Sequence, residues 1–175
     1  MATYIVDIAH SSIEFSVKHM MVSKVRGLFE SFSAQIEGEN IVDLANAQIH
    51  FDINVASLST RDAARDHHLI SADLFHADRY PKITFTKTDV IPISDKHFQI
   101  VGDMMIKDIQ HSVTFDVTYN GHVINPWGTD TFGFSCYTKI NRKDFNLTYS
   151  ALLESGNFLI DEQVEVSVEL QLQPL

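Results

Sequence analysis

The sequence has 175 residues, 45% of them hydrophobic and 21% charged, which suffices for a buried core and excludes disorder as the main state. The formal net charge of −10 argues against nucleic acid as a partner, because phosphates repel an acidic protein. No segment is as long as a membrane-spanning helix, and the first residues lack the features of a secretory signal. We therefore expect a cytoplasmic protein that does not span a membrane. We expect the single cysteine, Cys136, to be a buried unreactive thiol.

Eight segments alternate apolar and polar side chains with a period of two, which is the pattern of a strand with one buried face and one wet face. None of them is a continuous apolar run, so the sheet is predicted to be antiparallel. Turns are expected between some of these segments, at residues 37–40, 94–96 and 120–121. The alternating segments cover residues 13–17, 32–36, 47–55, 83–85, 98–106, 113–119, 132–140 and 164–172.

One segment near residues 60–76 breaks this period, since it is rich in Arg, Asp, Ala and Leu and poor in β-branched residues. It predicts a short helix over residues 61–69, with Ser59 or Thr60 as the N-cap. A second turn, capped by Ser71 and running through Phe75, is expected to follow.

Amphipathic strands must bury their apolar faces, so these strands are expected to form a sandwich or to close into a barrel. Their length favours the barrel. At about eight strands, a barrel is either filled by its own side chains or just wide enough for one small ligand. The inward residues are mostly Phe, Ile, Val and Met, so any ligand there must be a hydrocarbon over most of its length. No repeat or linker is visible, and residues 1–175 are predicted to be one domain.

A series of local motifs runs along the chain in a fixed order. They are Asp7-x-x-His10-Ser11-Ser12-Ile13-x-Phe15-x-Val17-Lys18-His19, Val25-Arg26-Gly27-x-Phe29, Arg61-Asp62 with Arg65-Asp66-x-His68-Leu69, Ser71-Ala72-Asp73-x-Phe75, Tyr80-Pro81-x-Ile83-x-Phe85, Val101-Gly102-Asp103-Met104-x-Ile106, Pro126-Trp127-Gly128, Phe132-Gly133-Phe134 and Ile140-Asn141-Arg142-x-Asp144-Phe145-x-Leu147. Together, from Tyr4 to about Leu172, they resemble the YceI-like family of lipid-binding proteins.

The resemblance implies a mainly β fold, an antiparallel lipocalin-like barrel of about eight strands with a short helical excursion near residues 60–76. It also implies a ligand, a polyisoprenoid such as a prenylated quinone or an isoprenyl phosphate, and a homodimer. Many relatives are periplasmic, whereas this chain shows no signal peptide. Relatives often carry a basic residue where Thr131 and Phe132 stand here, and a Gly-containing turn where this chain has residues 107–111.

With the resemblance, inward-facing residues become candidates for lining a ligand-binding lumen, although a plainly packed core is the alternative for each of them. The candidates are Phe15, Val17, His19, Phe29, Phe32, Ile49, Phe51, Phe85, Met104, Phe115, Trp127 and Phe134. His19 shares a face with Ile13 and Phe15, so it is either a core histidine or a polar contact to a ligand head group.

Arginine side chains are candidates for contacting a phosphorylated head group, because guanidinium pairs bidentately with phosphate. Ordinary ion pairs with neighbouring aspartates are the alternative. No metal site is expected, since the adjacent His67 and His68 point about 100° apart on a helix. The head-group candidates are Arg26, Arg61, Arg65 and Arg142.

Three functions remain open at this point. The first is a non-catalytic protein that carries or stores an isoprenoid lipid in the lumen, with no required cofactor. The second is an enzyme of the cyclase or isomerase type in the same cavity, for which His19 is the inward titratable candidate. The third is a filled barrel that acts through its surface.

Overall fold

The computed structural model describes residues 2–20, 22–149 and 160–175, which form an eleven-stranded sheet, one α-helix and three 3-10 helices. The strands are β1 (Ala2–Val6), β2 (Ser12–His19), β3 (Ser23–Phe29), β4 (Phe32–Gly38), β5 (Gln48–Asn54), β6 (Leu58–Ser59), β7 (Lys82–Pro92), β8 (His97–Ile106), β9 (Ile109–Ile124), β10 (Asp130–Asn141) and β11 (Ile160–Pro174). The helices are α1 (Ala63–Leu69), η1 (Ile8–His10), η2 (Val55–Ser57) and η3 (Arg142–Phe145).

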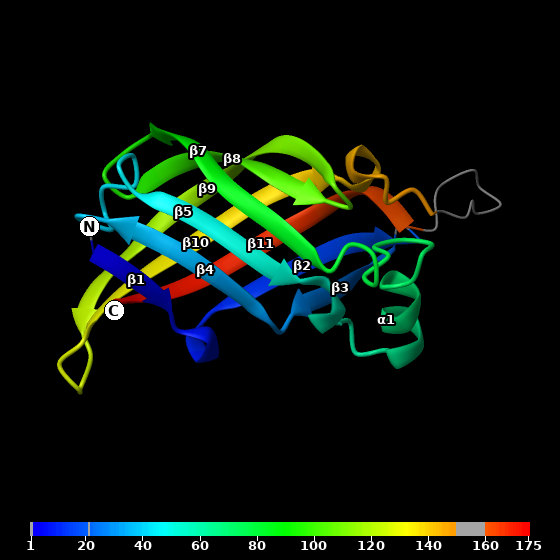
Figure 1. Ribbon diagram of the computed structural model, residues 1–175, viewed down its shortest axis with the longest axis horizontal. Helices are drawn as coiled ribbons and strands as arrows, with labels where there is room; N and C mark the ends of the chain where they lie inside the picture. The colour runs from blue at the N-terminus through cyan, green and yellow to red at the C-terminus, as the bar shows by residue number, and fades with distance from the viewer. Residues whose placement is uncertain (1, 21, 150–159) are drawn as a thin grey trace.

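The sheet closes on itself, because β1 pairs with both β4 and β11. This completes a ring of eight strands in the order β1-β4-β5-β7-β8-β9-β10-β11, and every neighbouring pair in it is antiparallel. Figure 1 shows α1 at one end of the barrel and both termini at the other. The predicted fold, a mainly β antiparallel barrel of about eight strands, is confirmed.

Three neighbouring strands of the barrel wall are each interrupted at the same level. Strands β2, β3 and β6 are the parts that lie beyond these interruptions. After η1, β2 continues along β11; β3 pairs with β2 and leads into β4; and β6 follows β5 and pairs with β3. Main-chain hydrogen bonds cross the breaks, from Glu30 N to Ser57 O at 3.2 Å and from Asn54 N to Ser31 O at 3.0 Å. The three strands beyond the breaks extend the wall toward α1 (Figure 1).

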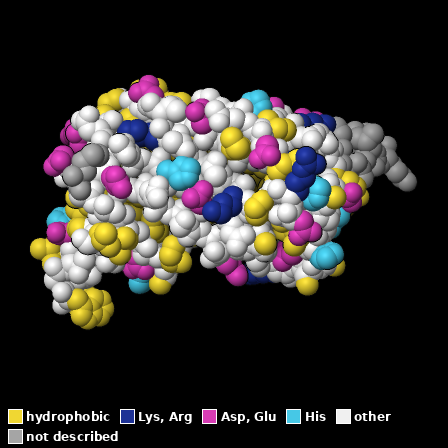
Figure 2. All heavy atoms as spheres, in the orientation of Figure 1, with side chains coloured by type: hydrophobic (Ala, Val, Ile, Leu, Met, Phe, Trp, Pro, Cys, Tyr) yellow, Lys and Arg dark blue, Asp and Glu magenta, His cyan; other side chains and the backbone are white. Residues whose placement is uncertain are grey.

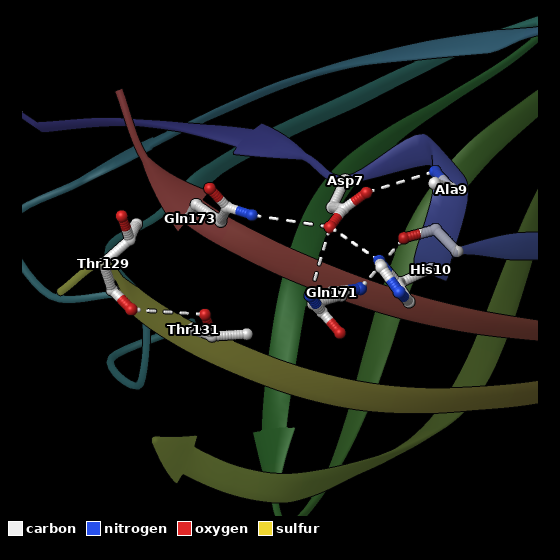
Figure 3. A network of polar contacts seen from close by, with 8 residues as sticks. Asp7, Ala9, His10, Thr129, Thr131, Gln171 and Gln173 are labelled. Atoms are coloured by element: carbon white, nitrogen blue, oxygen red, sulfur yellow. Dashed lines mark hydrogen bonds and ion pairs between the residues drawn. The ribbon is translucent and has the colours of Figure 1, made fainter. Parts of the chain in front are cut away.

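Asp7 holds the first break, between β1 and β2 (Figure 3). Its carboxylate accepts hydrogen bonds from Ala9 N at 3.1 Å and from Gln171 Nε2 at 3.2 Å, and it lies 2.9 Å from His10 Nδ1. Ser11 Oγ accepts a further bond from Gln171 N at 3.0 Å. These contacts tie η1 to β11, so the strand pair that closes the ring is fixed next to the break.

The helical excursion lies where the sequence predicts it, but its N-cap residue is not one of the two predicted. The cap is Asp62, whose carboxylate bonds the first turn of α1, and not Ser59 or Thr60. Arg61 has a left-handed φ of 66°, so the α-helix cannot start before it. The expected second turn is confirmed, because residues 72–75 form a turn and Asp73 N donates to Ser71 Oγ at 3.4 Å. No helix among the described residues is long and apolar enough to cross a membrane.

Two further expectations about the strands need correction. Residues 120–121, expected as a turn, lie inside β9, where the register against β10 shifts between Gly133 and Phe134. The glycine there belongs to a bulge, and the chain reverses at residues 125–129. Strands β1, β3 and β6 are absent from the prediction, because β1 and β6 are short and Gly27 interrupts the apolar face of β3.

Candidate functional site

The barrel encloses an apolar cavity of about 110 Å³, walled by inward side chains of β2, β4, β5 and β7 to β11. The predicted lining residues Ile49, Phe51, Phe85, Met104, Phe115 and Phe134 all lie in this wall. The other lining residues on the strands lie on the same period-two faces, and the alternation could therefore have identified them. They are Ile13, Ile36, Ile53, Ile100, Val117, Cys136, Val166, Val168, Leu170 and Leu172. Ile41 and Leu44 also line the cavity but come from the loop between β4 and β5, where no periodicity points to them.

The wall of the cavity carries a single titratable side chain among the described residues, the thiol of Cys136. Burial raises the pKa of this thiol to about 12, and the negative charge of Glu169 acts in the same direction. A thiol with such a pKa stays protonated near neutral pH and is a poor nucleophile. The interior is therefore an apolar environment that disfavours charge, as the sequence-based expectation of an unreactive cysteine requires.

The loop of residues 39–47 closes the cavity at the end of the barrel where the termini lie. Ile41 and Leu44 of this loop are 1% and 4% exposed and form part of the cavity wall. The ammonium group of Lys87, on β7, donates hydrogen bonds to the carbonyl oxygens of Leu44 at 2.9 Å, Ala45 at 3.0 Å and Ala47. Burial lowers the pKa of Lys87, which Asp43 and Asp89 oppose. One lysine thus holds the loop over the end of the lumen.

Phe15 separates the cavity from the α1 end of the barrel. Its ring lies over Gly27, its direct partner across the β2–β3 pair, where a Cβ would come within 2.3 Å of the ring. The ring also packs against Phe29 with the centroids 5.5 Å apart, and Phe29 meets Phe75 at 6.4 Å. Gly27 is therefore required for the close approach of Phe15, an arrangement in which an aromatic ring covers a strand glycine. Phe15 and Phe29 form a partition and do not line the cavity as predicted.

A polar groove of about 1260 Å³ runs along β2, β3, β11 and the start of α1, and Phe15 borders it. It brings together Arg26, Arg61 and Arg65, three of the residues that the sequence suggests for a head group, and His19. The groove also contains carboxylates. Lys24 and Glu165 form an ion pair of 3.2 Å, and this contact lowers the pKa of Glu165. The other carboxylates of the groove are Glu14, Glu30 and Asp62.

The three arginines of the groove differ in how they are bound. Arg65 donates from Nε to Thr60 Oγ1 at 2.8 Å and from Nη2 to Thr60 O at 2.6 Å. The side chains of Arg26 and Arg61 are exposed and make no hydrogen bond or ion pair with any residue that the structure describes. Arg61 also adopts a left-handed backbone conformation, which is strained for a residue other than glycine. Such strained positions cluster at functional sites. Arg26 and Arg61 are therefore available to an anion, and Arg65 is partly committed.

Arg142 is not available to a ligand, which corrects its assignment as a head-group candidate. It is 5% exposed and lies in η3. Its guanidinium donates to the carbonyl oxygens of Asp161 at 2.9 Å, Tyr149 at 2.9 Å, Ile160 at 3.3 Å and Leu147. These bonds join the loop after η3 to the start of β11, so the role of Arg142 is structural.

Other predicted lining residues lie outside the cavity as well. Trp127 is 85% exposed in the turn between β9 and β10, because β9 runs past the bulge and carries the turn beyond the barrel wall. Val17 pairs with Val25 and Phe32 packs at the margin of the core, and neither borders the cavity. His19, at the end of β2, lines the polar groove instead.

Histidine side chains do not converge on a metal-binding geometry in the part of the chain that the structure describes. No group of three or more His, Cys, Asp or Glu residues there has an arrangement that could hold a metal ion. His68 instead lies 3.1 Å from the carboxylate of Asp73, and His122 lies 2.7 Å from that of Asp130.

Comparison with known sequences shows close relatives over the full length. A sequence model of the YceI-like domain matches residues 4–172. A UPF0312 protein of Staphylococcus aureus strain MSSA476 is 37% identical over 175 residues, which cover 98% of this chain and 99% of that protein.

Solved structures share the same barrel. The crystal structure of BcnA from Burkholderia cenocepacia superposes with a TM-score of 0.81 at 25% identity, covering 95% of this chain and 98% of that one. The YceI protein of Campylobacter jejuni gives a TM-score of 0.75 at 27% identity, covering 89% and 88%. A polyisoprenoid binding domain from Saccharophagus degradans covers both chains completely with a TM-score of 0.72, and at 14% identity it supports the fold alone.

Proposed function

Because this chain belongs to the family of YceI-like domains, we propose that it is a non-catalytic binding protein that holds the chain of an isoprenoid lipid in its barrel lumen. The observation that carries the proposal is the lining of the cavity, in which hydrocarbon side chains meet from eight strands and Cys136 is the lone ionisable group among the described residues. Such a wall provides contact area and excludes any ligand that needs hydrogen bonds. Polyisoprenoid binding is named for the domain from Saccharophagus degradans, which has the same fold.

The head group of the lipid would lie in the polar groove. The guanidinium groups of Arg26 and Arg61 have no partner there among the described residues, and Arg65 and His19 line the same groove. Guanidinium groups suit a phosphate or diphosphate, and they also donate hydrogen bonds to the oxygens of a quinone ring. The groove thus favours either a prenylated quinone or an isoprenyl phosphate, with the polar end outside Phe15 and the chain inside.

The present volume of the cavity means that the lumen must widen to admit a long chain. Pockets that enclose small ligands typically measure about 300–1,000 Å³, whereas this cavity measures about 110 Å³. Phe15 and Phe85 are the side chains whose movement would enlarge it, since both rings cover glycines, Gly27 and Gly102, that have no side chain of their own. The small volume is also the observation that favours the second candidate, a filled barrel that acts through its surface.

An enzyme acting on the same lipid would need an acid or a base that faces the chain. The described cavity wall offers Cys136, which burial keeps protonated, and His19 lies in the groove. This arrangement supports binding over cyclisation or isomerisation. A His19→Gln variant separates the two, because it would abolish turnover in an enzyme and would only weaken head-group contact in a binding protein.

Native mass spectrometry tests the proposal. The purified protein is measured alone and after addition of two probes with equal chains, a prenylated quinone and a prenyl diphosphate. Binding predicts a complex of one lipid per barrel, with the extracted lipid unchanged in mass, chromatographic retention and fragmentation. No uptake of either probe would support the filled barrel, and recovery of a lipid with altered retention or fragmentation, at the same mass or a different one, would support the enzyme.

A further inference from the structure

The hairpin between β9 and β10 projects beyond the body of the barrel, at the end opposite α1 (Figure 1). Its tip exposes three large apolar side chains: Val123 is 63%, Ile124 67% and Trp127 85% accessible to solvent. Figure 2 shows hydrophobic side-chain atoms at the far end of this tip. The cavity and the groove described above do not use these residues.

The turn that carries Trp127 is held by its own hydrogen bonds. Asn125 Oδ1 accepts from the main-chain nitrogens of Trp127 and Thr129, each at 3.0 Å, and Asn125 N donates to Thr129 O at 2.9 Å. Gly128 donates to Asn125 O at 3.0 Å and has a left-handed φ of 83°. The indole is therefore presented by an ordered backbone, and docking it costs little additional ordering.

Residues 123–129, Val-Ile-Asn-Pro-Trp-Gly-Thr, contain no charged side chain. The flanking titratable side chains are those of His122 and Asp130, whose Nε2 and Oδ1 atoms lie 2.7 Å apart at the base of the hairpin. Tryptophan is enriched at membrane–water interfaces, where its ring enters the apolar layer and its N–H meets polar groups. A stable protein interface typically needs about 20–30 residues on each side, far more than this tip supplies.

From this geometry we infer that the β9–β10 tip docks on a lipid bilayer, with Trp127, Ile124 and Val123 entering the interfacial layer. The chain carries a net charge of −10, so the bilayer it fits is a zwitterionic one, and anionic lipid opposes docking. Docking places the barrel on the membrane in which an isoprenoid ligand dissolves. The use of docking for lipid exchange rests on the proposed function, whereas docking itself does not.

Trp127 is the single tryptophan of the chain, so its fluorescence reports on the tip directly. With phosphatidylcholine vesicles we expect a blue shift of the emission and quenching by brominated acyl chains, and we expect both to weaken when phosphatidylglycerol is mixed in at low salt. In vesicle flotation, Trp127→Ala should lower partitioning about tenfold or more, because burial of one large apolar side chain is lost. Ile124→Ser should act in the same direction and keeps the fluorophore.

Val22→Ser is the matched control, because Val22 is 82% exposed in the turn between β2 and β3, at the opposite end of the barrel. It should leave partitioning unchanged. An unshifted emission in vesicles, or equal partitioning of Trp127→Ala and Val22→Ser, overturns docking. A change of oligomeric state in Trp127→Ala, without a change in flotation, would assign the tip to a second copy of the chain and also overturns it.

Loading experiments distinguish failure of docking from failure of the proposed function. A prenylated quinone is supplied either from cyclodextrin or from phosphatidylcholine vesicles. If both inferences hold, Trp127→Ala loads normally from cyclodextrin and at least several-fold more slowly from vesicles. Equal loading of Trp127→Ala and wild type from vesicles contradicts the role of docking in exchange. Absence of loading from both sources contradicts the proposed function, and flotation then tests docking independently.

Discussion

The apolar cavity and the polar groove share strands β2 and β11 but have opposite chemistry. Along the inward face of β2, Ile13 borders the cavity, Phe15 forms the partition and His19 borders the groove. On the cavity side, burial raises the pKa of Cys136 to about 12. On the groove side, Arg26 and Arg61 stay exposed and free of described partners. A lipid with a long chain and a polar end needs both regions, and the partition is where they meet.

The comparison also shows that residue type alone does not identify a ligand contact. Arg26 and Arg142 are the same amino acid, yet one lies in an open groove and the other is saturated by main-chain carbonyls. The difference lies in burial and in the partners nearby. The following substitutions test these assignments, beginning with the largest effect.

Arg142→Met should destabilise the fold by about 3–5 kcal/mol, because it leaves several carbonyl oxygens without a donor and empties part of a packed site. Arg26→Met is the matched control, since Arg26 is exposed, and it should change the free energy of unfolding by less than about 0.5 kcal/mol. Urea denaturation followed by circular dichroism measures both values. Equal effects of the two substitutions would contradict the structural role of Arg142.

The thiol of Cys136 should react with a neutral disulfide reagent about a thousandfold more slowly in the native protein than in urea, because its pKa is raised from 9.0 to about 12. The absorbance of the released thiolate follows the reaction at pH 8. Rapid labelling of the native protein would show that water and reagents enter the lumen freely. This result would contradict a cavity that excludes water.

The same raised pKa predicts a pH dependence of stability. The protonated thiol is favoured in the folded state. Its contribution to the free energy of unfolding is therefore complete below pH 9 and is lost as the pH rises from 9 toward 12. Between pH 9 and 10.5 the loss should be about 2 kcal/mol. Cys136→Ala should remove this part of the alkaline destabilisation, as measured by urea denaturation of both proteins across the same pH series.

Gly27→Ala should destabilise the protein by about 1–3 kcal/mol, because the added methyl group meets the ring of Phe15 and forces it from its place. Gly133→Ala is the control, since a Cβ there meets its nearest atom at an ordinary 3.5 Å. Thermal unfolding compares the two variants. If Gly27→Ala is tolerated as well as Gly133→Ala, Phe15 is not fixed in the partition.

The double variant Arg26→Met, Arg61→Met should weaken binding of a prenyl diphosphate by about tenfold, because charge-assisted hydrogen bonds to phosphate are lost. Binding of a prenylated quinone should change less, and added salt should reduce the difference. Competition between the two probes in native mass spectra measures this ratio. An unchanged ratio would place the head group outside the groove.

Much of the fold could be predicted from periodicity, and much of the site could not. The alternation over residues 164–172 identifies β11 and its buried face because each side chain can point only inward or outward. Ile41 and Leu44 follow no period, so their place in the cavity wall depends on a loop whose path Lys87 fixes. The motif around Trp127 wrongly predicts a place in the lumen, because it shows an aromatic residue and not how far the hairpin extends.

The central claim is that the lumen of the barrel holds the isoprenoid chain. Val117, on β9, is 3% exposed and lines the cavity, whereas Thr114 on the same strand faces outward and is exposed. The decisive measurement is the stoichiometry of prenylated quinone bound to Val117→Phe and Thr114→Phe in native mass spectra, with thermal unfolding to confirm that both are folded. We expect the added ring to abolish binding in Val117→Phe and to leave one lipid per barrel in Thr114→Phe. Equal binding by both folded variants would contradict it.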